Sequence, residues 1–384
     1  MYQIYYNDTL LYDPRGANTA EPGDRTFALV DGRLQLAVDS AGRLTMTLAA
    51  GHPAIGQIVP RLGVVKVVEL IGSNAETVFL GRVIRETLNL DNSHSYEVEG
   101  RLACLNDTIM LPHSLPEDYA SDSGYQAAVA ANTVPSWWLG KLLETHNGMA
   151  VTDNNRIQPG TVTVTGGAMA RSADDYRSMW ETIREELPNS PLGGHLVVRY
   201  AGDTAYLDYL AELTDENAQH VVFGENLLDL SRSTNAEDYY NSIIPIGKDG
   251  MRCSAAPNGY QDAAHTYFKS GPYVINSPQS NGGYGCVFRT VSWPEVTDPQ
   301  ELVDRAVAML AAAVFIDEIQ ISAADLSLIG TETAAFRIAR ILIIEDPPQG
   351  IRQGYAVMCL DIDLTGGVET RLTLGTRGVS LTGR

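Results

Sequence analysis

Leu34-Gln35-Leu36-Ala37-Val38 and Leu44-Thr45-Met46-Thr47-Leu48 carry the pattern that decides the fold. In both segments a large apolar side chain occurs at every second position. Because successive side chains of a strand point to opposite faces, each segment is predicted to be a strand with one buried face. The intervening Ser40-Ala41-Gly42-Arg43 favours a turn. The whole stretch therefore predicts an antiparallel β-hairpin.

Similar short segments continue through the first hundred residues. They occupy residues 64–70, 78–84 and 96–99, and polar turns at 72–74 and 91–94 separate them. Several short strands at this spacing are typical of a barrel or a sandwich. The character changes after about residue 107. Residues 111–133 are rich in Pro, Ser, Asp and Gly and are predicted to be irregular.

Three helices are predicted in the rest of the chain. One covers Trp137–Asn147. A second begins at Ser172 as N-cap, continues with apolar residues on one helical face and ends before Pro188. The third begins after Asp298, where a cap and the first-turn Pro299 follow in order.

Strands are predicted between and after these helices, at residues 195–200, 206–210, 319–328, 336–344, 355–364 and 370–374. Strands come first, a mixed region follows, and strands with one helix end the chain. This order differs from the regular βαβ alternation of a parallel sheet. The sequence therefore predicts an α+β, β-rich multidomain protein.

Composition excludes several classes of protein. The chain has 384 residues with 27 Lys+Arg against 47 Asp+Glu, a formal net charge of −20, and 44% of its residues are hydrophobic. Such a chain is apolar enough to bury cores, and its length suggests roughly two to four domains. Its negative charge should repel nucleic-acid phosphates and anionic lipid headgroups. We therefore expect neither sequence-specific nucleic-acid binding nor a membrane-surface role.

The sequence also carries no signal for membranes or secretion. No apolar run reaches the roughly eighteen residues that a spanning helix needs. The first residues, Met1-Tyr2-Gln3-Ile4-Tyr5, lack the basic and apolar regions of a signal peptide. We therefore expect no membrane insertion and synthesis in the cytoplasm.

A search for catalytic motifs finds none. The chain has no GxSxG elbow, no P-loop and no HExxH, and its seven histidines show no metal-ligand spacing. The four cysteines are widely scattered and are expected to be buried small hydrophobes. Asp361 and Asp363 share one strand face, which favours a solvated surface over a glycosidase pair. No catalytic, cofactor-binding or metal-binding residue is predicted, and no cofactor.

Several segments resemble a known family. They include Tyr6-Asn7-Asp8-Thr9-Leu10-Leu11-Tyr12-Asp13, Val78-Phe79-Leu80-Gly81-Arg82-Val83, Phe223-Gly224-Glu225-Asn226-Leu227-Leu228-Asp229-Leu230 and Ile244-Pro245-Ile246-Gly247. Their order is similar to the N-terminal hub region of siphophage tail-tip proteins, the prophage tail-endopeptidase or tail-associated-lysin family. Members of that family resemble the baseplate hub of contractile phages. Many continue into an enzymatic or fibre-like region, and no position here matches a peptidase or muramidase residue.

The resemblance implies an architecture. It implies two tail-tube-like β-barrels with α/β insertions, assembled as a homotrimer whose six barrels mimic the six-fold tube. Residues 1–106 would form the first barrel, completed by about 221–235, with 107–220 as a mixed α/β insertion. Residues 236–384 would form the second barrel with a helix-containing insertion.

The motif positions carried over from the family are structural ones. They are Gly81, Arg82, Phe223, Gly224, Asn226, Leu227, Pro245 and Gly247. Gly81 is expected to mark a bulge or a close backbone approach, with Arg82 available for a polar contact. Phe223 to Asn226 would lead back into the first barrel, and Pro245 to Gly247 would open the second.

The implied function is structural. The chain would join the tail tube to the distal, cell-facing end of a phage or prophage tail, bind other tail proteins and form a ring for DNA passage. A negative ring interior would let DNA slide without sticking. Two alternatives stay open: a cell-wall-degrading tail enzyme, either a peptidase or a glycosidase, and a carbohydrate- or receptor-binding module that uses exposed Tyr and Trp.

Overall fold

The computed structural model of the protein describes residues 1–14, 29–72, 74–149, 152–167, 169, 171–190, 192–235, 239–261, 265–276, 285–294, 296–312, 316–329, 334–365, 367 and 369–375. Ser73 of the predicted turn lies outside them. The chain divides into two compact units. The first unit combines Met1–Ser231 with Ile319–Thr376, and the second holds Arg232–Glu318. The chain thus leaves the first unit after Ser231 and returns to it at Ile319.

The largest sheet is built from both ends of the chain. Within the described residues it has thirteen strands: β1 (Tyr2–Tyr6), β2 (Thr9–Tyr12), β3 (Leu29–Ala37), β4 (Arg43–Leu48), β5 (Val65–Ile71), β6 (Asn74–Leu88), β7 (His94–Gly100), β15 (Val221–Val222), β16 (Leu227–Asn235), β21 (Ile316–Ala324), β22 (Ile341–Asp346), β23 (Ile351–Asp363) and β24 (Glu369–Gly375). Its main path runs β16-β21-β24-β23-β3-β4-β7-β6-β5-β1-β2, and β22 pairs with both β23 and β15.

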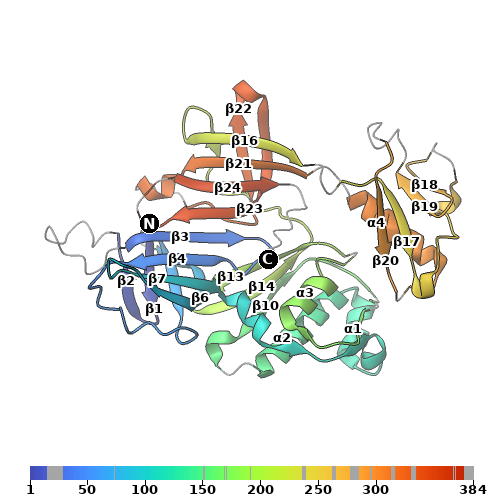
Figure 1. The fold of residues 1–384 in the computed structure, drawn as a ribbon, viewed down its shortest axis with the longest axis horizontal. Coiled ribbons are helices and arrows are strands. Elements are labelled where there is room, and N and C mark those ends of the chain that lie inside the picture. The colour runs from blue at the N-terminus through green and yellow to red at the C-terminus, as the bar shows by residue number, and fades with distance from the viewer. Residues whose placement is uncertain are drawn as a thin grey trace. The chain divides into compact units, whose positions relative to one another are not determined.

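The predicted hairpin lies in the middle of this path. β3 and β4 pair antiparallel, with Leu34 opposite Leu44, and the turn between them uses left-handed backbone at Asp39 and Gly42. On its other side β3 pairs antiparallel with β23, with Leu36 opposite Leu360. An ion pair between Arg33 and Asp361 crosses the same junction. Figure 1 shows the blue strands β3 and β4 beside the red strands β23 and β24.

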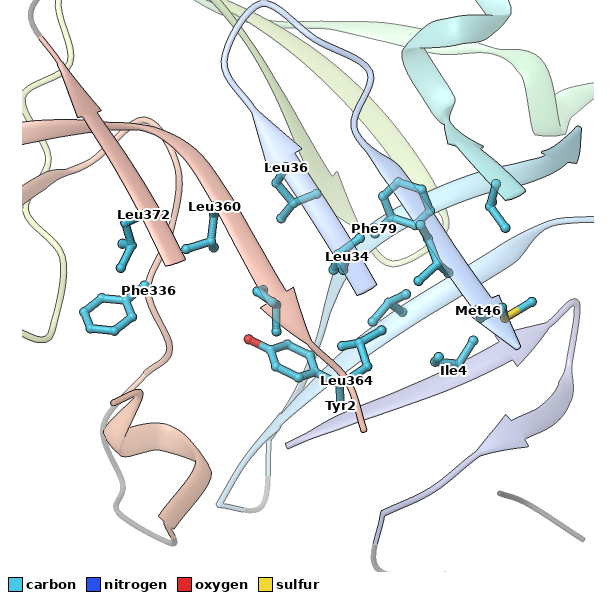
Figure 2. Close-up of a cluster of buried hydrophobic side chains, with 14 of the residues drawn as sticks. Tyr2, Ile4, Leu34, Leu36, Met46, Phe79, Phe336, Leu360, Leu364 and Leu372 are labelled. Carbon is cyan, nitrogen blue, oxygen red and sulfur yellow. The ribbon is translucent and has the colours of Figure 1, made fainter. Parts of the chain in front are cut away.

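One core lies beneath both groups of strands. The close-up in Figure 2 shows Ile4, Leu34 and Phe79 from the early strands in the same cluster as Phe336 and Leu372 from the late ones. All five side chains are buried. Because each such side chain contributes about 1.5–3 kcal/mol when it leaves water, this shared core holds the two ends of the chain together.

Residues 221–235 pair with strands from the late part of the chain. The family resemblance implies that they complete the first barrel, and that assignment stays a prediction. In the structure β15 pairs in parallel with β22, and β16 lies next to β21. Both partners come from the late part of the chain. The reason is the second unit, which is inserted between β16 and β21 and leaves them as neighbours.

The mixed region between β7 and β15 has its own core. It contains β8 (Ile109–Met110), β9 (His113–Leu115), β10 (Ile157–Val162), β11 (Arg171–Ala173), β12 (Arg177–Ser178), β13 (His195–Ala201), β14 (Thr204–Leu210), α1 (Ser123–Ala131), α2 (Val134–Met149) and α3 (Met179–Glu186). The predicted pair of strands at 195–200 and 206–210 is confirmed as β13 and β14. Trp138 of α2 is fully buried in this core, so it packs rather than binds a ligand.

The second unit is small. It holds β17 (Ser242–Ile246), β18 (Tyr267–Ser270), β19 (Tyr273–Asn276), β20 (Phe288–Ser292) and α4 (Pro299–Ala312). Its sheet runs β18-β19-β17-β20. The predicted helix after Asp298 is confirmed as α4, and the Asp298 carboxylate accepts a hydrogen bond from the Gln300 N–H at 3.1 Å. The chain as a whole is β-rich and α+β, as predicted.

Several local predictions are wrong. The second helix begins at Met179 after the N-cap Ser178, because residues around Ser172 pair instead as β11 with β9. Residues 111–133, predicted as irregular, contain helix α1. β22 begins at Ile341 rather than at Phe336. Cys286 is exposed instead of buried.

Candidate assembly surface

The motif loop at Phe223 presents an aromatic ring to solvent. Phe223 is 55% exposed, and its backbone N–H donates to the Glu345 carbonyl at 2.8 Å. Gly224 follows with φ of +82°, a conformation that glycine adopts readily. The loop is thus fixed by its backbone while the ring stays uncovered.

Asn226 closes this loop from inside. Its side chain is buried, its Oδ1 accepts from the Val222 N–H at 2.9 Å, and its Nδ2 donates to the His220 carbonyl at 2.9 Å. Its own carbonyl accepts from the Ala324 N–H of β21 at 2.8 Å. Leu227, the next residue, packs against the large core. An asparagine is needed here because it supplies a donor and an acceptor at once.

β16 ends the sheet path directly after this loop. Among the described strands it has a neighbour on one side only, β21. Leu228 on this strand is 56% exposed. An uncovered edge strand presents unpaired N–H and C=O groups that can pair with another chain. We call Phe223, Leu228 and the free edge of β16 the edge patch.

A second exposed apolar group lies at the hairpin of β6 and β7. Leu88 ends β6 and is 63% exposed, and Leu90 in the turn that follows is fully exposed. The Asn89 Nδ2 donates to Ser93 and Ser95 at 3.0 and 2.8 Å and fixes this turn. This exposed apolar group was not predicted from the sequence. Its signal was an apolar residue at 90 inside the polar run Asn89-Leu90-Asp91-Asn92.

Gly81 and Arg82 lie in the middle of β6 and belong neither to the edge patch nor to the exposed pair Leu88 and Leu90. A Cβ at Gly81 would lie 2.4 Å from the Glu99 carbonyl oxygen, so the position admits only glycine without a backbone shift. The Arg82 side chain is buried, and its Nε donates to Glu99 at 2.6 Å. It also forms an ion pair with Asp107. Arg82 thereby ties β6 to β7 and to the segment that follows it.

Asp107 receives a second arginine. Arg61 donates to it at 2.7 Å. Burial alone would raise the pKa of Asp107, but the hydrogen bonds from Arg82 and Arg61 outweigh burial and hold that pKa below its ordinary value. The carboxylate is therefore charged at neutral pH.

Pro245 and Gly247 lie in the second unit, whereas the other motif positions all belong to the first. Pro245 is part of β17, opposite Val291 of β20. A Cβ at Gly247 would lie 2.8 Å from the Val296 carbonyl oxygen, another close approach. The structure therefore gathers Phe223, Gly224, Asn226 and Leu227 in one segment and leaves the remaining positions at two other places, β6 and the end of β17.

The described residues contain no group of three or more His, Cys, Asp or Glu side chains arranged to hold a metal ion. No helix in the described part of the chain is long and apolar enough to cross a membrane. A polar cluster joins His113, Glu186 and Trp138. It is buried in the mixed region.

Both ring nitrogens of His113 face acceptors. Nε2 lies 2.8 Å from Glu186 and Nδ1 lies 3.0 Å from the Leu111 carbonyl, while the Trp138 Nε1 donates to Glu186 at 2.7 Å. A carbonyl and a carboxylate only accept, so both nitrogens donate and the ring is charged. Burial lowers the pKa of His113, but the hydrogen bonds to Glu186 and to the Leu111 carbonyl, together with the charges of Glu186 and Asp118, outweigh burial and raise that pKa overall.

This cluster predicts a pH dependence of stability. Because the pKa of His113 is higher in the folded protein, its stabilisation is complete below about pH 6.5 and declines as the pH rises through the raised pKa. We expect the free energy of unfolding of wild type to fall between pH 6 and pH 9 relative to that of His113→Gln. Urea unfolding at both pH values measures the difference. Parallel pH profiles for the two proteins would contradict the prediction.

Comparisons with known proteins agree with this architecture. No protein-family model matches the sequence, and no curated protein matches it. The structure is similar to the 43 kDa tail protein of prophage MuSo2 from Shewanella oneidensis, with a TM-score of 0.57, 9% identity and 97% of both chains covered. A tail protein from Neisseria meningitidis gives 0.51 at 10% identity, covering 98% of this chain and 97% of that one.

A third structure, prophage tail protein gp18 from Listeria monocytogenes, gives a TM-score of 0.51 at 11% identity, covering 99% of this chain and 95% of that one. The likeness includes both units and spans nearly the full length of all three proteins. The chain therefore has the fold of these prophage tail proteins. The resemblance found in the sequence motifs is confirmed at the level of the fold.

Proposed function

We propose that this chain is a structural component of a phage or prophage tail, placed at the tail tip or baseplate hub. The observation that carries the proposal is the fold, which is shared with a prophage tail protein over 97% of both chains. The edge patch adds a surface suited to assembly, since it combines an open strand edge with exposed apolar side chains. In this role the chain joins the tail tube to its distal, cell-facing end and binds other tail proteins.

The two groups of strands in the large sheet are the counterparts of two tail-tube-like barrels. β1 to β7 form the first group, and β15, β16 and β21 to β24 form the second, with β3 and β23 joining them. Residues 107–220 and the segment between β16 and β21 are insertions. This division is supported by the sheet order, in which each group is continuous.

The assembly we propose is a homotrimeric ring. Three copies would bring six strand groups together and match a six-fold tube. They would also carry a formal charge of about −60, three times the −20 of one chain. Acidic residues facing the ring interior would repel DNA phosphates and allow passage without binding.

Charge introduced into the edge patch should weaken assembly. We expect Phe223→Asp combined with Leu228→Asp to convert the wild-type trimer into monomer, because a carboxylate cannot enter a desolvated apolar interface without a partner. Light scattering coupled to size-exclusion chromatography measures the mass. Tyr176→Asp is the matched control, since Tyr176 is 69% exposed and lies outside the patch. A wild-type protein that stays monomeric at tens of micromolar would count against the trimer.

A further inference from the structure

A pocket of about 260 Å³ opens beside β6 in the first unit. Three arginines line it, Arg61, Arg82 and Arg101, together with Cys104 and Asn155. Arg82 projects from β6, and Arg101 begins the short 3-10 helix Arg101–Asp107 that follows β7. Asn155 ends another short helical turn, Asp153–Asn155, at the other side of the pocket. These residues come from four separate segments that the fold brings together.

Two of the three arginines already have carboxylate partners. Arg82 pairs with Glu99 and Asp107, and Arg61 pairs with Asp107. Arg101 is different. It is only 4% exposed, and among the described residues no hydrogen bond or ion pair to its guanidinium is found. Burial lowers the pKa of Arg101, which is the expected effect of desolvation on a cation.

A largely buried guanidinium without a partner is costly, because it loses most of its water and gains no hydrogen bond in return. A ligand that supplies a hydrogen-bond acceptor would offset this cost. The two neighbouring arginines, Arg61 and Arg82, both form ion pairs with carboxylates, which indicates that this pocket accommodates arginine–carboxylate pairs. A guanidinium offers five N–H donors in a fork that fits the two oxygens of a carboxylate.

The charges around the pocket leave one positive charge uncompensated. Three arginines face two carboxylates, Glu99 and Asp107. Asp203, which also influences Arg101, is paired with Lys66 at 3.0 Å. Burial raises the pKa of the Cys104 thiol, so the thiol is neutral near pH 7. A single monovalent carboxylate would therefore balance the site.

We propose that this pocket binds a carboxylate through the guanidinium of Arg101. The carboxylate has two available sources, a free small carboxylate and an Asp or Glu side chain of a second copy of this chain. The second source rests on the proposed function, because it requires assembly. The first does not, and it can be tested on the isolated protein.

The first experiment is a titration of wild type and Arg101→Met with sodium acetate at constant ionic strength, with sodium chloride as the reference salt. We expect acetate to raise the melting temperature of wild type, and the apparent affinity to be at least tenfold weaker in Arg101→Met. Arg156→Met is the matched control, since this nearby arginine is more than half exposed and pairs with Asp153. It should bind acetate as wild type does.

The second experiment measures the self-association of the same proteins by analytical ultracentrifugation, with and without acetate. Weaker association of Arg101→Met, together with competition by acetate, assigns the site to a side chain of a second copy. Acetate binding that depends on Arg101 without any change in association assigns it to a free carboxylate. If wild type is monomeric, the trimer fails while the acetate titration still tests the pocket.

The variant itself gives an independent readout. Arg101→Met removes an unpaired buried charge, so its melting temperature in chloride should equal or exceed that of wild type. Should Arg101→Met fail to fold, Arg101→Lys keeps the charge but loses the planar fork, and it should bind acetate several-fold more weakly. Equal acetate affinity and equal self-association in wild type and variant would overturn the proposal.

Discussion

Replacing Gly100 with alanine should destabilise the first unit by about 3 kcal/mol, a large value for a single added methyl group. Gly100 ends β7, and its N–H donates to the Gly42 carbonyl at 3.0 Å. A Cβ at this position would lie 1.7 Å from the carbonyl oxygen of Ala41. The obstructing group is the backbone carbonyl of Ala41, so no side-chain rotation relieves the clash. The hairpin turn between β3 and β4 would have to move away.

Urea unfolding of the variant and wild type measures this loss. Gly140→Ala is the matched control, because Gly140 lies within α2 and a Cβ there meets no atom within 4 Å. Alanine favours a helix over glycine by about 0.8–1 kcal/mol, so this control should be more stable than wild type. A Gly100→Ala protein with an unchanged midpoint would show that the approach of Ala41 does not constrain the fold.

Replacing Arg337 with methionine should cost about 3–5 kcal/mol, because it leaves a buried carboxylate without its counter-charge. The Glu69 side chain on β5 is completely buried. It forms an ion pair with Arg337 and accepts a hydrogen bond from the Ala335 N–H at 3.1 Å. These contacts join an early strand to the segment before β22, so their loss weakens the attachment between the two ends of the chain.

A surface pair serves as the control for this variant. Arg352 lies 3.8 Å from Glu345, and its side chain is 82% exposed. Exposed pairs contribute about 0–1 kcal/mol, so Arg352→Met should unfold nearly as wild type does. The double variant Glu69→Leu with Arg337→Met should recover part of the loss, since two apolar side chains carry no desolvation cost. An Arg337→Met protein as stable as Arg352→Met would exclude a structural role for the buried pair.

Local patterns predicted the regular elements well where packing and sequence agree. The alternation at 34–48 predicted β3 and β4 because one face of each strand is buried. They failed where two segments carry the same signal. Ser172 and Ser178 each precede an acidic residue by three positions, and only Ser178 caps a helix, accepting from the Glu181 N–H at 3.1 Å. Pairing of Ser172 with Ser114 decides between them, and that contact is distant in sequence.

Helix α1 was missed for a related reason. Its cap is present in the sequence, since the Asp122 carboxylate accepts from the Tyr125 N–H at 2.9 Å. The alanine-rich run that follows has high helix propensity. The Pro, Ser and Asp residues before it dominated the prediction. Attention to the cap would have located this helix.

The polar contacts that define the pocket and the buried pair could not be predicted. Glu69 and Arg337 are 268 residues apart, and the sequence around neither residue indicates that the two form an ion pair. A charged residue such as Arg101 is expected on the surface from its type alone. Its burial results from the packing of several segments against β6. Such sites emerge only from the tertiary fold.

The pairing of β3 with β23 has a consequence for how the protein is made. Leu36 pairs opposite Leu360, which is synthesised more than three hundred residues later. One edge of the central hairpin therefore has no partner strand until the late part of the chain has left the ribosome. During that interval the edge of β3 is open to any other strand, including one from a neighbouring nascent chain. The long sequence separation also predicts slow folding. Chaperone dependence and yield at low temperature should therefore respond most strongly to changes along β3.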